Sequence, residues 1–151
     1  MPGNELLSPE LRRAVGVSSA PITYLVEKGH IKRFAEAVGE TNPLYLDEAP
    51  AGESVQASLI APPTFLRVLA AADLPDIIGL VPLKRRLDGG SEWEFFEHVK
   101  SGDSITVVAH YSDFKIRNGR NGEMLFAILE TIYTDQLGRV VATQKATRIL
   151  Y

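Results

Sequence analysis

Four segments in the C-terminal part of the chain constrain its fold most strongly. Each is rich in β-branched and aromatic residues, a composition typical of strands. They span residues 92–98, 104–114, 124–134 and 140–151. Turn-forming sequences separate them, at 100–103 (KSGD), 118–122 (NGRNG) and 135–138 (DQLG). We expect the last two turns to close hairpins, so these segments predict an antiparallel sheet.

The first 60 residues combine short elements with loop. Residues 31–38 place four apolar side chains on one face of a 3.6-residue period, and Gly39 follows as a stop signal. We therefore predict a helix over 31–38, after a short helix over 9–15 and a short strand over 22–26. Residues 40–60 carry turn formers and little periodicity, so they are expected to form a loop with room for a helical turn.

A second, apolar helix is expected in the middle of the chain. Pro62-Pro63-Thr64 can open it, because proline is tolerated in the first turn of a helix. The following residues 65–72 contain a single charged side chain, that of Arg67. A helix this apolar is normally buried, so we expect it to lie against the sheet.

These elements combine into one α+β domain. One buried helix against one antiparallel sheet is an α+β arrangement. A long antiparallel sheet wrapped around one long central apolar helix is the hot-dog fold. The chain has 151 residues, of which 45% are apolar, which is enough for one core and too little for two domains. We predict a single hot-dog domain over residues 1–151, with residues 1–20 as an N-terminal extension.

The composition excludes several classes of function. There is no cysteine, so disulfides, thiolate metal sites and cysteine nucleophiles are ruled out. The net charge of −3 gives no electrostatic reason to expect nucleic acid or a membrane as a partner. No segment approaches the ~18 apolar residues of a membrane span, and residues 1–16 lack the apolar region of a signal peptide. We therefore expect a cytoplasmic protein.

Three segments together resemble one protein family. They are residues 33–48 (RFAEAVGETNPLYLDE), 60–65 (IAPPTF) and 88–103, which includes DGG at 88–90, EWEFF at 92–96 and SGD at 101–103. In this order they are similar to the MaoC-like dehydratases, and in particular to their N-terminal, fatty-acid-synthase-type half. The resemblance covers residues 20–151. It implies a hot-dog fold and chemistry on 2-enoyl thioesters, by addition or removal of water.

The resemblance also implies where catalysis would take place. Active members of the family carry an aspartate and a histidine in a G-D-x-N-P-x-H pattern, and this pair activates the water. Here Glu40 stands at the aspartate position and Tyr45 at the histidine position. General base catalysis needs a group that titrates close to neutral pH, whereas a tyrosine ordinarily titrates near ~10. We therefore interpret Glu40 and Tyr45 as degenerate catalytic positions.

The start of the expected central helix also differs from the pattern of active family members. In active members, backbone N–H groups at this place polarise the thioester carbonyl, and His-Gly typically precedes them. This chain has Pro62-Pro63 instead, and proline has no N–H to donate, which leaves Thr64 and Phe65 as donors. The substrate-binding residues that the resemblance implies are Asn42, Pro63, Thr64, Phe65 and Trp93.

Several of these residues also have structural interpretations. Asn42 can satisfy a simple turn, Glu40 can be a surface charge at a helix end, and Tyr45 can pack at the edge of the core. Trp93 can belong to the core or to a dimer interface. The histidines have no metal-ligand spacing, so no metal site is predicted and each is expected to have a structural or surface role. They are His30, His98 and His110.

The residues leave several functions open. The first is an acyl-thioester-binding subunit of a (3R)-hydroxyacyl-thioester dehydratase or 2-enoyl-CoA hydratase, which depends on a catalytic hot-dog partner. The second is a self-sufficient homodimeric enoyl-CoA hydratase that uses Glu40 and Tyr45. The third is a non-enzymatic acyl-CoA-binding protein. A thioesterase with a carboxylate on the central helix is disfavoured, because residues 62–72 contain no Asp or Glu.

Partners and cofactors follow from the same reasoning. The resemblance implies an acyl thioester of coenzyme A or of acyl carrier protein as substrate, and no cofactor besides this carrier. A single sheet leaves its edge strands open, and pairing with a second sheet covers them. We therefore expect a homodimer, or a heterodimer with another hot-dog subunit.

Overall fold

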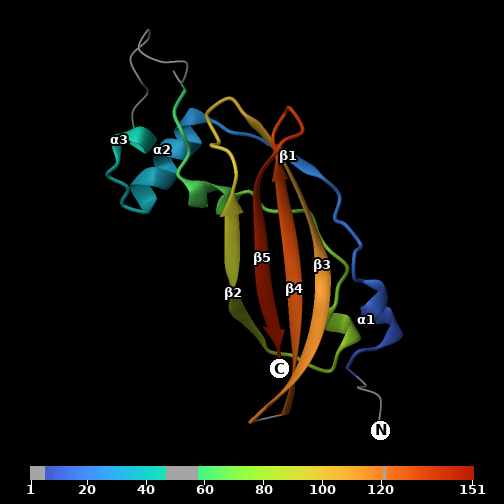
Figure 1. Cartoon of the computed structure of the whole chain (residues 1–151). Helices are drawn as coiled ribbons and strands as arrows, with labels where there is room; N and C mark the ends of the chain where they lie inside the picture. The colour runs from blue at the N-terminus through green and yellow to red at the C-terminus, as the bar shows by residue number, and fades with distance from the viewer. Residues whose placement is uncertain (1–5, 47–57, 121) are drawn as a thin grey trace.

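A computed structural model describes residues 6–46, 58–120 and 122–151 of the chain. Most of the expected loop over 40–60, and Asn121 in the expected turn over 118–122, lie outside these residues. In the order of the chain, the described elements are α1 (Pro9–Arg13), β1 (Ile22–Leu25), α2 (Lys28–Ala37), α3 (Pro43–Leu46), the 3₁₀ helices η1 (Pro63–Val68) and η2 (Ile78–Leu80), β2 (Arg86–Phe95), β3 (Ser104–Gly119), β4 (Gly122–Thr134) and β5 (Val140–Leu150). Figure 1 shows one curved sheet, with α2 and α3 at one end and α1 near the other.

All five strands form one antiparallel sheet in the order β1-β3-β4-β5-β2. The predicted hairpins are confirmed: Gly119 pairs with Gly122 at the β3–β4 turn, and Thr134 pairs with Val140 across the β4–β5 turn. The sheet places β2 at one edge and the short β1 at the other. The α+β hot-dog prediction is confirmed by this arrangement.

The strand β2 begins earlier than the sequence suggested. The strand was expected over 92–98, but the preceding Asp88-Gly89-Gly90 segment already lies inside β2, as an irregularity in its pairing with β5. Gly90 has a φ of +96°, which a residue with a side chain rarely adopts. A Cβ at Gly89 would come within 3.0 Å of Thr147 on β5. The two glycines thus let the strand bend and stay close to its neighbour.

The inward face of the sheet is set by strict alternation along the strands. On β3, the residues Ile105, Val107, Ala109 and Tyr111 are buried. The intervening His110 lies on the outer face, where its Nε2 is 3.6 Å from Glu130, and Glu130 in turn pairs with Lys145. This placement of His110 confirms its predicted structural role on the face opposite the core.

The described part of the expected N-terminal extension, residues 6–20, contributes to the core. The predicted short helix is confirmed as α1, and its Leu11 is fully buried against the far end of the sheet. The Ser8 side chain accepts a hydrogen bond from the Leu11 N–H and caps this helix. Beyond α1, Ser19 bonds to both the N–H and the carbonyl of Ala109, which ties the segment to β3.

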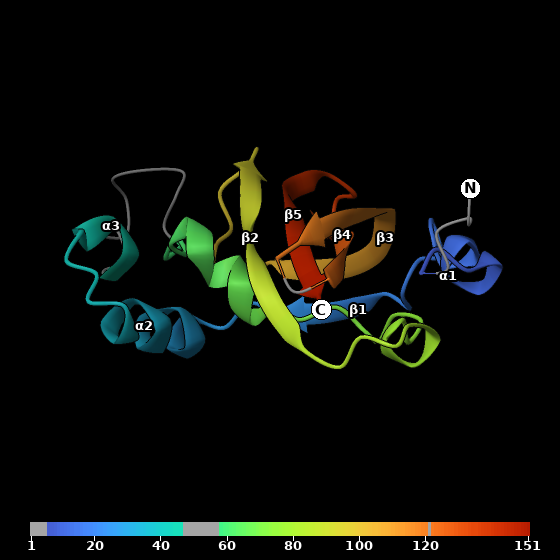
Figure 2. The same ribbon diagram turned by 90° about the horizontal axis from the view of Figure 1, so that it is seen from below.

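The long central helix expected from the sequence is absent from the described residues. In its place stands η1, which ends at Val68, and Leu69 already has extended backbone angles of φ −89° and ψ 95°. The hydroxyl of Tyr24 on β1 donates to the Ala70 carbonyl at 2.8 Å, which a continuing helix would use itself. The chain from 69 to 77 then runs along the sheet as irregular backbone before η2 (Figure 2). The burial of Phe65, Leu66 and Leu69 was therefore predicted correctly, and the predicted length of the helix was wrong.

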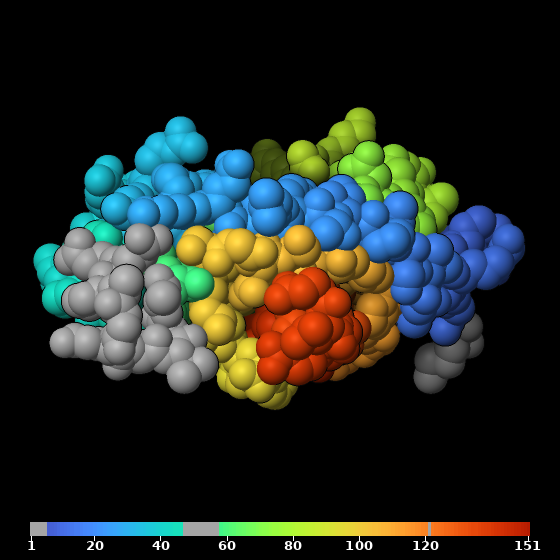
Figure 3. All heavy atoms as spheres, turned by 90° about the horizontal axis from the view of Figure 1, so that it is seen from above, coloured from blue at the N-terminus to red at the C-terminus, as the bar shows by residue number. Residues whose placement is uncertain are grey.

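One end of the sheet is closed by the turn between β4 and β5 (Figure 3). Asp135, at the start of this turn, has a nearly fully buried side chain that accepts from the N–H groups of Leu137 and Arg139 and pairs with the Arg139 guanidinium at 2.8 Å. Burial alone would raise the pKa of Asp135, but these hydrogen bonds and the Arg139 charge outweigh it and lower the pKa below its ordinary value. Gln136 bridges to Asp103 and Ser104 in the neighbouring turn.

We predict that Asp135→Asn lowers the free energy of unfolding by about 2 kcal/mol at pH 7, because charge-assisted hydrogen bonds are lost. A depressed carboxyl pKa stabilises the fold above the pKa of the unfolded chain, ~3.9, and this contribution disappears as pH falls through the folded value. Urea unfolding of both proteins at several pH values between 7 and 3 should therefore show the difference shrinking with acid. Asp113→Asn, which removes an exposed carboxylate next to Lys115, is the matched control. A difference that is constant across this range would contradict the assignment.

Candidate functional site

The motif stretch after α2 folds as a self-contained turn. Gly39 ends α2 with a φ of +71°, the left-handed conformation common just beyond a helix. The Glu40 Oε1 accepts hydrogen bonds from the N–H groups of Thr41 and Asn42, each at 2.9 Å. The Asn42 Oδ1 accepts from the Leu44 N–H at 3.1 Å and begins α3. The carboxylate and the amide therefore hold the backbone of their own loop.

Tyr45 lies one turn further on, in α3. Its N–H donates to the Asn42 carbonyl at 3.1 Å, and its side chain is half-buried. Within the described part of the chain no hydrogen bond joins Tyr45 to Glu40. Glu40 and Tyr45, interpreted above as degenerate catalytic positions, are therefore close in the chain, and no hydrogen bond among the described residues joins them.

Phe65 has a core role that the sequence interpretation missed. Its side chain is 0% exposed, and its ring stands edge-on to His30 at 5.0 Å and to Phe34 at 5.7 Å between ring centroids. His30, expected just before the helix, thus lies inside α2 and packs on Phe65. The Phe65 N–H donates to the Pro62 carbonyl at 2.9 Å, so the expected availability of this N–H for a thioester carbonyl is wrong.

Three further residues were expected to bind substrate: Pro63, Thr64 and Trp93. Pro63 lines a small cavity of ≈ 270 Å³ together with Phe95, Phe96 and His98, and Thr64 beside it is exposed. Trp93 stacks on Phe95 and on Tyr133, with ring centroids 5.7 and 5.5 Å apart. No hydrogen bond, ring contact or shared cavity among the described residues joins these side chains to Glu40, Asn42 or Tyr45.

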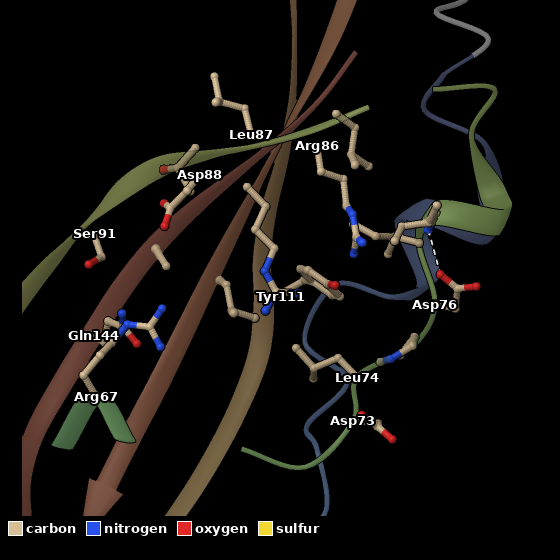
Figure 4. A pocket seen from close by; sticks show the side chains of 18 residues that line it. Arg67, Asp73, Leu74, Asp76, Arg86, Leu87, Asp88, Ser91, Tyr111 and Gln144 are labelled. Atoms are coloured by element: carbon tan, nitrogen blue, oxygen red, sulfur yellow. Dashed lines mark hydrogen bonds between the residues drawn. The ribbon is translucent and has the colours of Figure 1, made fainter. Parts of the chain in front are cut away.

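A large cavity lies between η1, the segment that follows it and the sheet. It measures ≈ 790 Å³, within the range of small-molecule sites, and lies between the inner face of the sheet and the segment 67–78. Figure 4 shows Arg67 reaching into it from η1, Arg86 from β2 and Gln144 from β5. None of these residues was expected from the sequence. The sequence did contain an indication of a polar site in β5: the inward-facing residues of this strand are small or apolar except for Gln144 and Arg148.

Two tyrosines in this region are strongly influenced by burial. Burial raises the pKa of Tyr111, which lines the cavity, although the nearby Arg148 guanidinium and its hydrogen bond act in the opposite direction. Burial raises the pKa of Tyr133 to about 12, and the Arg67 charge partly opposes it. Both hydroxyls therefore stay protonated at neutral pH and can donate hydrogen bonds.

The described residues contain neither a metal site nor a membrane-spanning helix. Among residues 6–46, 58–120 and 122–151, no three His, Asp or Glu side chains come together as a metal site would require. In the same residues, no helix is long and apolar enough to cross a membrane. The cytoplasmic location expected from the sequence stays a prediction.

Comparisons with known proteins give the family. A model of the "FAS1-like, dehydratase domain region" matches residues 13–144. A UPF0336 protein of Clavibacter michiganensis is 28% identical over 148 residues, covering 95% of both chains. A "Probable enoyl-CoA hydratase alpha subunit" of Thermomonospora curvata is 32% identical over 132 residues, covering 76% of this chain and 41% of that one. The crystal structure of the truncated HadBC (3R-hydroxyacyl-ACP dehydratase) complex of Mycobacterium tuberculosis superposes with a TM-score of 0.70 at 20% identity, covering 90% of this chain and 96% of that one.

The fold defines the class: a hot-dog domain whose inner sheet face is covered by a short 3₁₀ helix. The family match over residues 13–144 makes the assignment specific. The chain belongs to the FAS1-like dehydratase-region family of MaoC-like hot-dog proteins.

Proposed function

We propose that this protein is the acyl-thioester-binding subunit of a (3R)-hydroxyacyl-thioester dehydratase or 2-enoyl-CoA hydratase, and that a catalytic hot-dog partner supplies the acid–base pair. The observation that carries the proposal is the ≈ 790 Å³ cavity left by the missing central helix. It provides room for an acyl group. Meanwhile Glu40 is engaged by two backbone N–H groups at the position where a water-activating carboxylate would stand. The carrier would be coenzyme A or acyl carrier protein, with no other cofactor.

The sheet edge supports the need for a partner. β2 is an edge strand, so one side of its backbone is open for pairing. It carries exposed Leu87 (55%) and Phe95 (43%), and Phe96 follows at 54%. Large apolar side chains on an open edge are typical of an interface. The HadBC structure is that of a complex, which fits this arrangement.

The self-sufficient hydratase is the weaker alternative. It needs Glu40 and Tyr45 to act together on a water, but Tyr45 is not hydrogen-bonded to Glu40 within the described residues. It also needs donors for the thioester carbonyl at the start of η1. There Pro62 and Pro63 offer none and the Phe65 N–H is already bonded, which leaves the Thr64 N–H as the one donor of residues 62–65.

We predict that the purified chain alone does not hydrate a short 2-enoyl-CoA above the uncatalysed rate, because Tyr45 stands where active members of the family have the catalytic histidine. Loss of the enoyl absorbance is the measurement. Adding a hot-dog subunit with an intact Asp/His motif should restore turnover, and Tyr45→Phe should leave the restored rate within about twofold, since a non-catalytic tyrosine hydroxyl contributes little to the transition state. Turnover by the chain alone that disappears in Tyr45→Phe would contradict the proposal and support the Glu40/Tyr45 enzyme.

The interface can be tested separately. We expect the chain to be dimeric, with itself or with its partner, through β2. Leu87→Glu with Phe95→Glu should shift it to monomer in light scattering, because two desolvated charges oppose association. Leu137→Glu, at the β4–β5 turn and 70% exposed, is the matched control and should leave the assembly unchanged. A strictly monomeric wild type that gains no partner, or a dimer insensitive to the β2 substitutions, would overturn this interface.

A further inference from the structure

The large cavity is lined by an unusual number of cations. Three guanidinium groups reach it from three different elements: Arg67 from η1, Arg86 from β2 and Arg148 from β5. Apart from Tyr111, which interacts with Arg148, no described residue bonds to any of the three. In particular, none of them forms an ion pair with a described carboxylate within 4.0 Å. All three arginines are exposed residues, so an incoming anion can reach their guanidinium groups.

The carboxylates around the cavity are occupied elsewhere. Asp76 accepts a hydrogen bond from the Ile78 N–H at 2.9 Å, and Asp88 accepts one from the Gly90 N–H at 2.8 Å. Figure 4 shows the Asp73 and Asp76 side chains directed away from the cavity, whereas Arg67 and Arg86 are directed into it. The acidic residues thus stabilise their own loops, and the arginines remain available to a ligand.

The rest of the lining suits an amphiphile. Leu129, Leu150 and Ile77 supply a buried apolar surface. Gln144 is only 9% exposed, and no described residue forms a hydrogen bond with its amide. Among the described residues no enclosed side-chain nitrogen or oxygen lacks a hydrogen-bond partner, so this amide opens onto the cavity, where a ligand can reach it. An oxygen-bearing group in the cavity would satisfy Gln144 and the arginines together.

We propose that this cavity binds an anionic group, and that the anion is a carboxylate at the remote end of the acyl chain. The preferred substrates would then be thioesters of dicarboxylic acids or of similarly acid-bearing acyl groups. A carboxylate matches the planar fork of an arginine, and the apolar floor accommodates the methylenes that lead to it. This inference rests on the proposed function in one respect: the dicarboxylic acid is bound as an acyl thioester. Coenzyme A phosphates are the other possible source of an anion.

The single tryptophan provides the readout. Trp93 is the cross-strand neighbour of Gln144 in the register of β2 with β5, so its fluorescence reports on the cavity. Octanedioyl-CoA, octanoyl-CoA, coenzyme A, free octanedioate and 1,8-octanediol should each be titrated. We expect octanedioyl-CoA to bind about tenfold more tightly than octanoyl-CoA, the gain of a charge-assisted pair. Free octanedioate should bind more tightly than octanediol.

Two variants test whether the arginines bind the remote carboxylate. Arg67→Gln and Arg148→Gln should each reduce the preference for octanedioyl-CoA to within about threefold, since one charged partner is lost. Arg13→Gln removes an equal charge from the exposed face of α1, where Arg13 pairs with Glu10, and should keep the full preference. Matching circular dichroism and urea midpoints for all variants ensure that only folded proteins are compared.

The outcomes separate this inference from the proposed function. Equal binding of the two acyl thioesters, unaffected by the arginine substitutions, would overturn the inference and leave the acyl-binding function standing. Binding of free octanedioate that depends on Arg67 and Arg148, without binding of either thioester, would support the anion site and overturn the proposed function. Tight binding of coenzyme A itself that weakens in both variants would assign the anion to its phosphates and overturn the assignment to the acyl end.

Discussion

The packing of Phe65 is the interaction on which the rest of the structure depends. A curved antiparallel sheet exposes an apolar inner face that must be covered. Here one fully buried phenyl ring, edge-on to His30 and Phe34, joins η1, α2 and the sheet in a single cluster with Val107 and Tyr133. Deleting a buried aromatic side chain ordinarily costs about 3–5 kcal/mol, a large part of a domain's stability. Because this contact is made within the first turn of η1, the chain need not continue as a helix.

The consequence is a sheet that is covered at its two ends and open between them. A second cluster around Leu11 and Leu125, built from α1 and the segment after η1, closes the far end. Residues 73–78, together with Arg67, face the inner side of the sheet across the large cavity, whereas Leu69 is buried in the first cluster. The same departure from a long helix therefore gives the protein room for a ligand beside the sheet.

Much of this could be predicted from the sequence, for identifiable reasons. The strands β3, β4 and β5 have strong alternation and clear turns, so their register followed from local pattern. Within the segment 65–72, Phe65, Leu66 and Leu69 are buried as expected, whereas Arg67, Val68 and Ala70 are exposed. Apolarity does not fix backbone conformation, and the Tyr24–Ala70 hydrogen bond joins residues 46 positions apart. The expected start of β2 after Asp88-Gly89-Gly90 was wrong, because glycines that precede a strand and glycines that bend one look alike in sequence.

The candidate site was less predictable than the fold. The motif alignment located Glu40, Asn42 and Tyr45 in one turn, yet their hydrogen bonds to their own backbone were visible only in three dimensions. The cations of the cavity come from three elements that no local pattern connects. In the sequence, Arg67 is the one charged residue of an apolar segment. Only the fold shows that it lines one cavity together with Arg86 and Gln144 (Figure 4).

The central claim is that the ligand binds on the open inner face of the sheet, where a long central helix would have been. Hydrogen–deuterium exchange with and without a saturating 2-octenoyl-CoA tests it most directly. Irregular segments with few backbone hydrogen bonds exchange readily, so protection there is easy to detect. The account predicts new protection over residues 69–78, beside the cavity. Protection confined to the turn around Glu40 and Tyr45, with no change over 69–78, would contradict it.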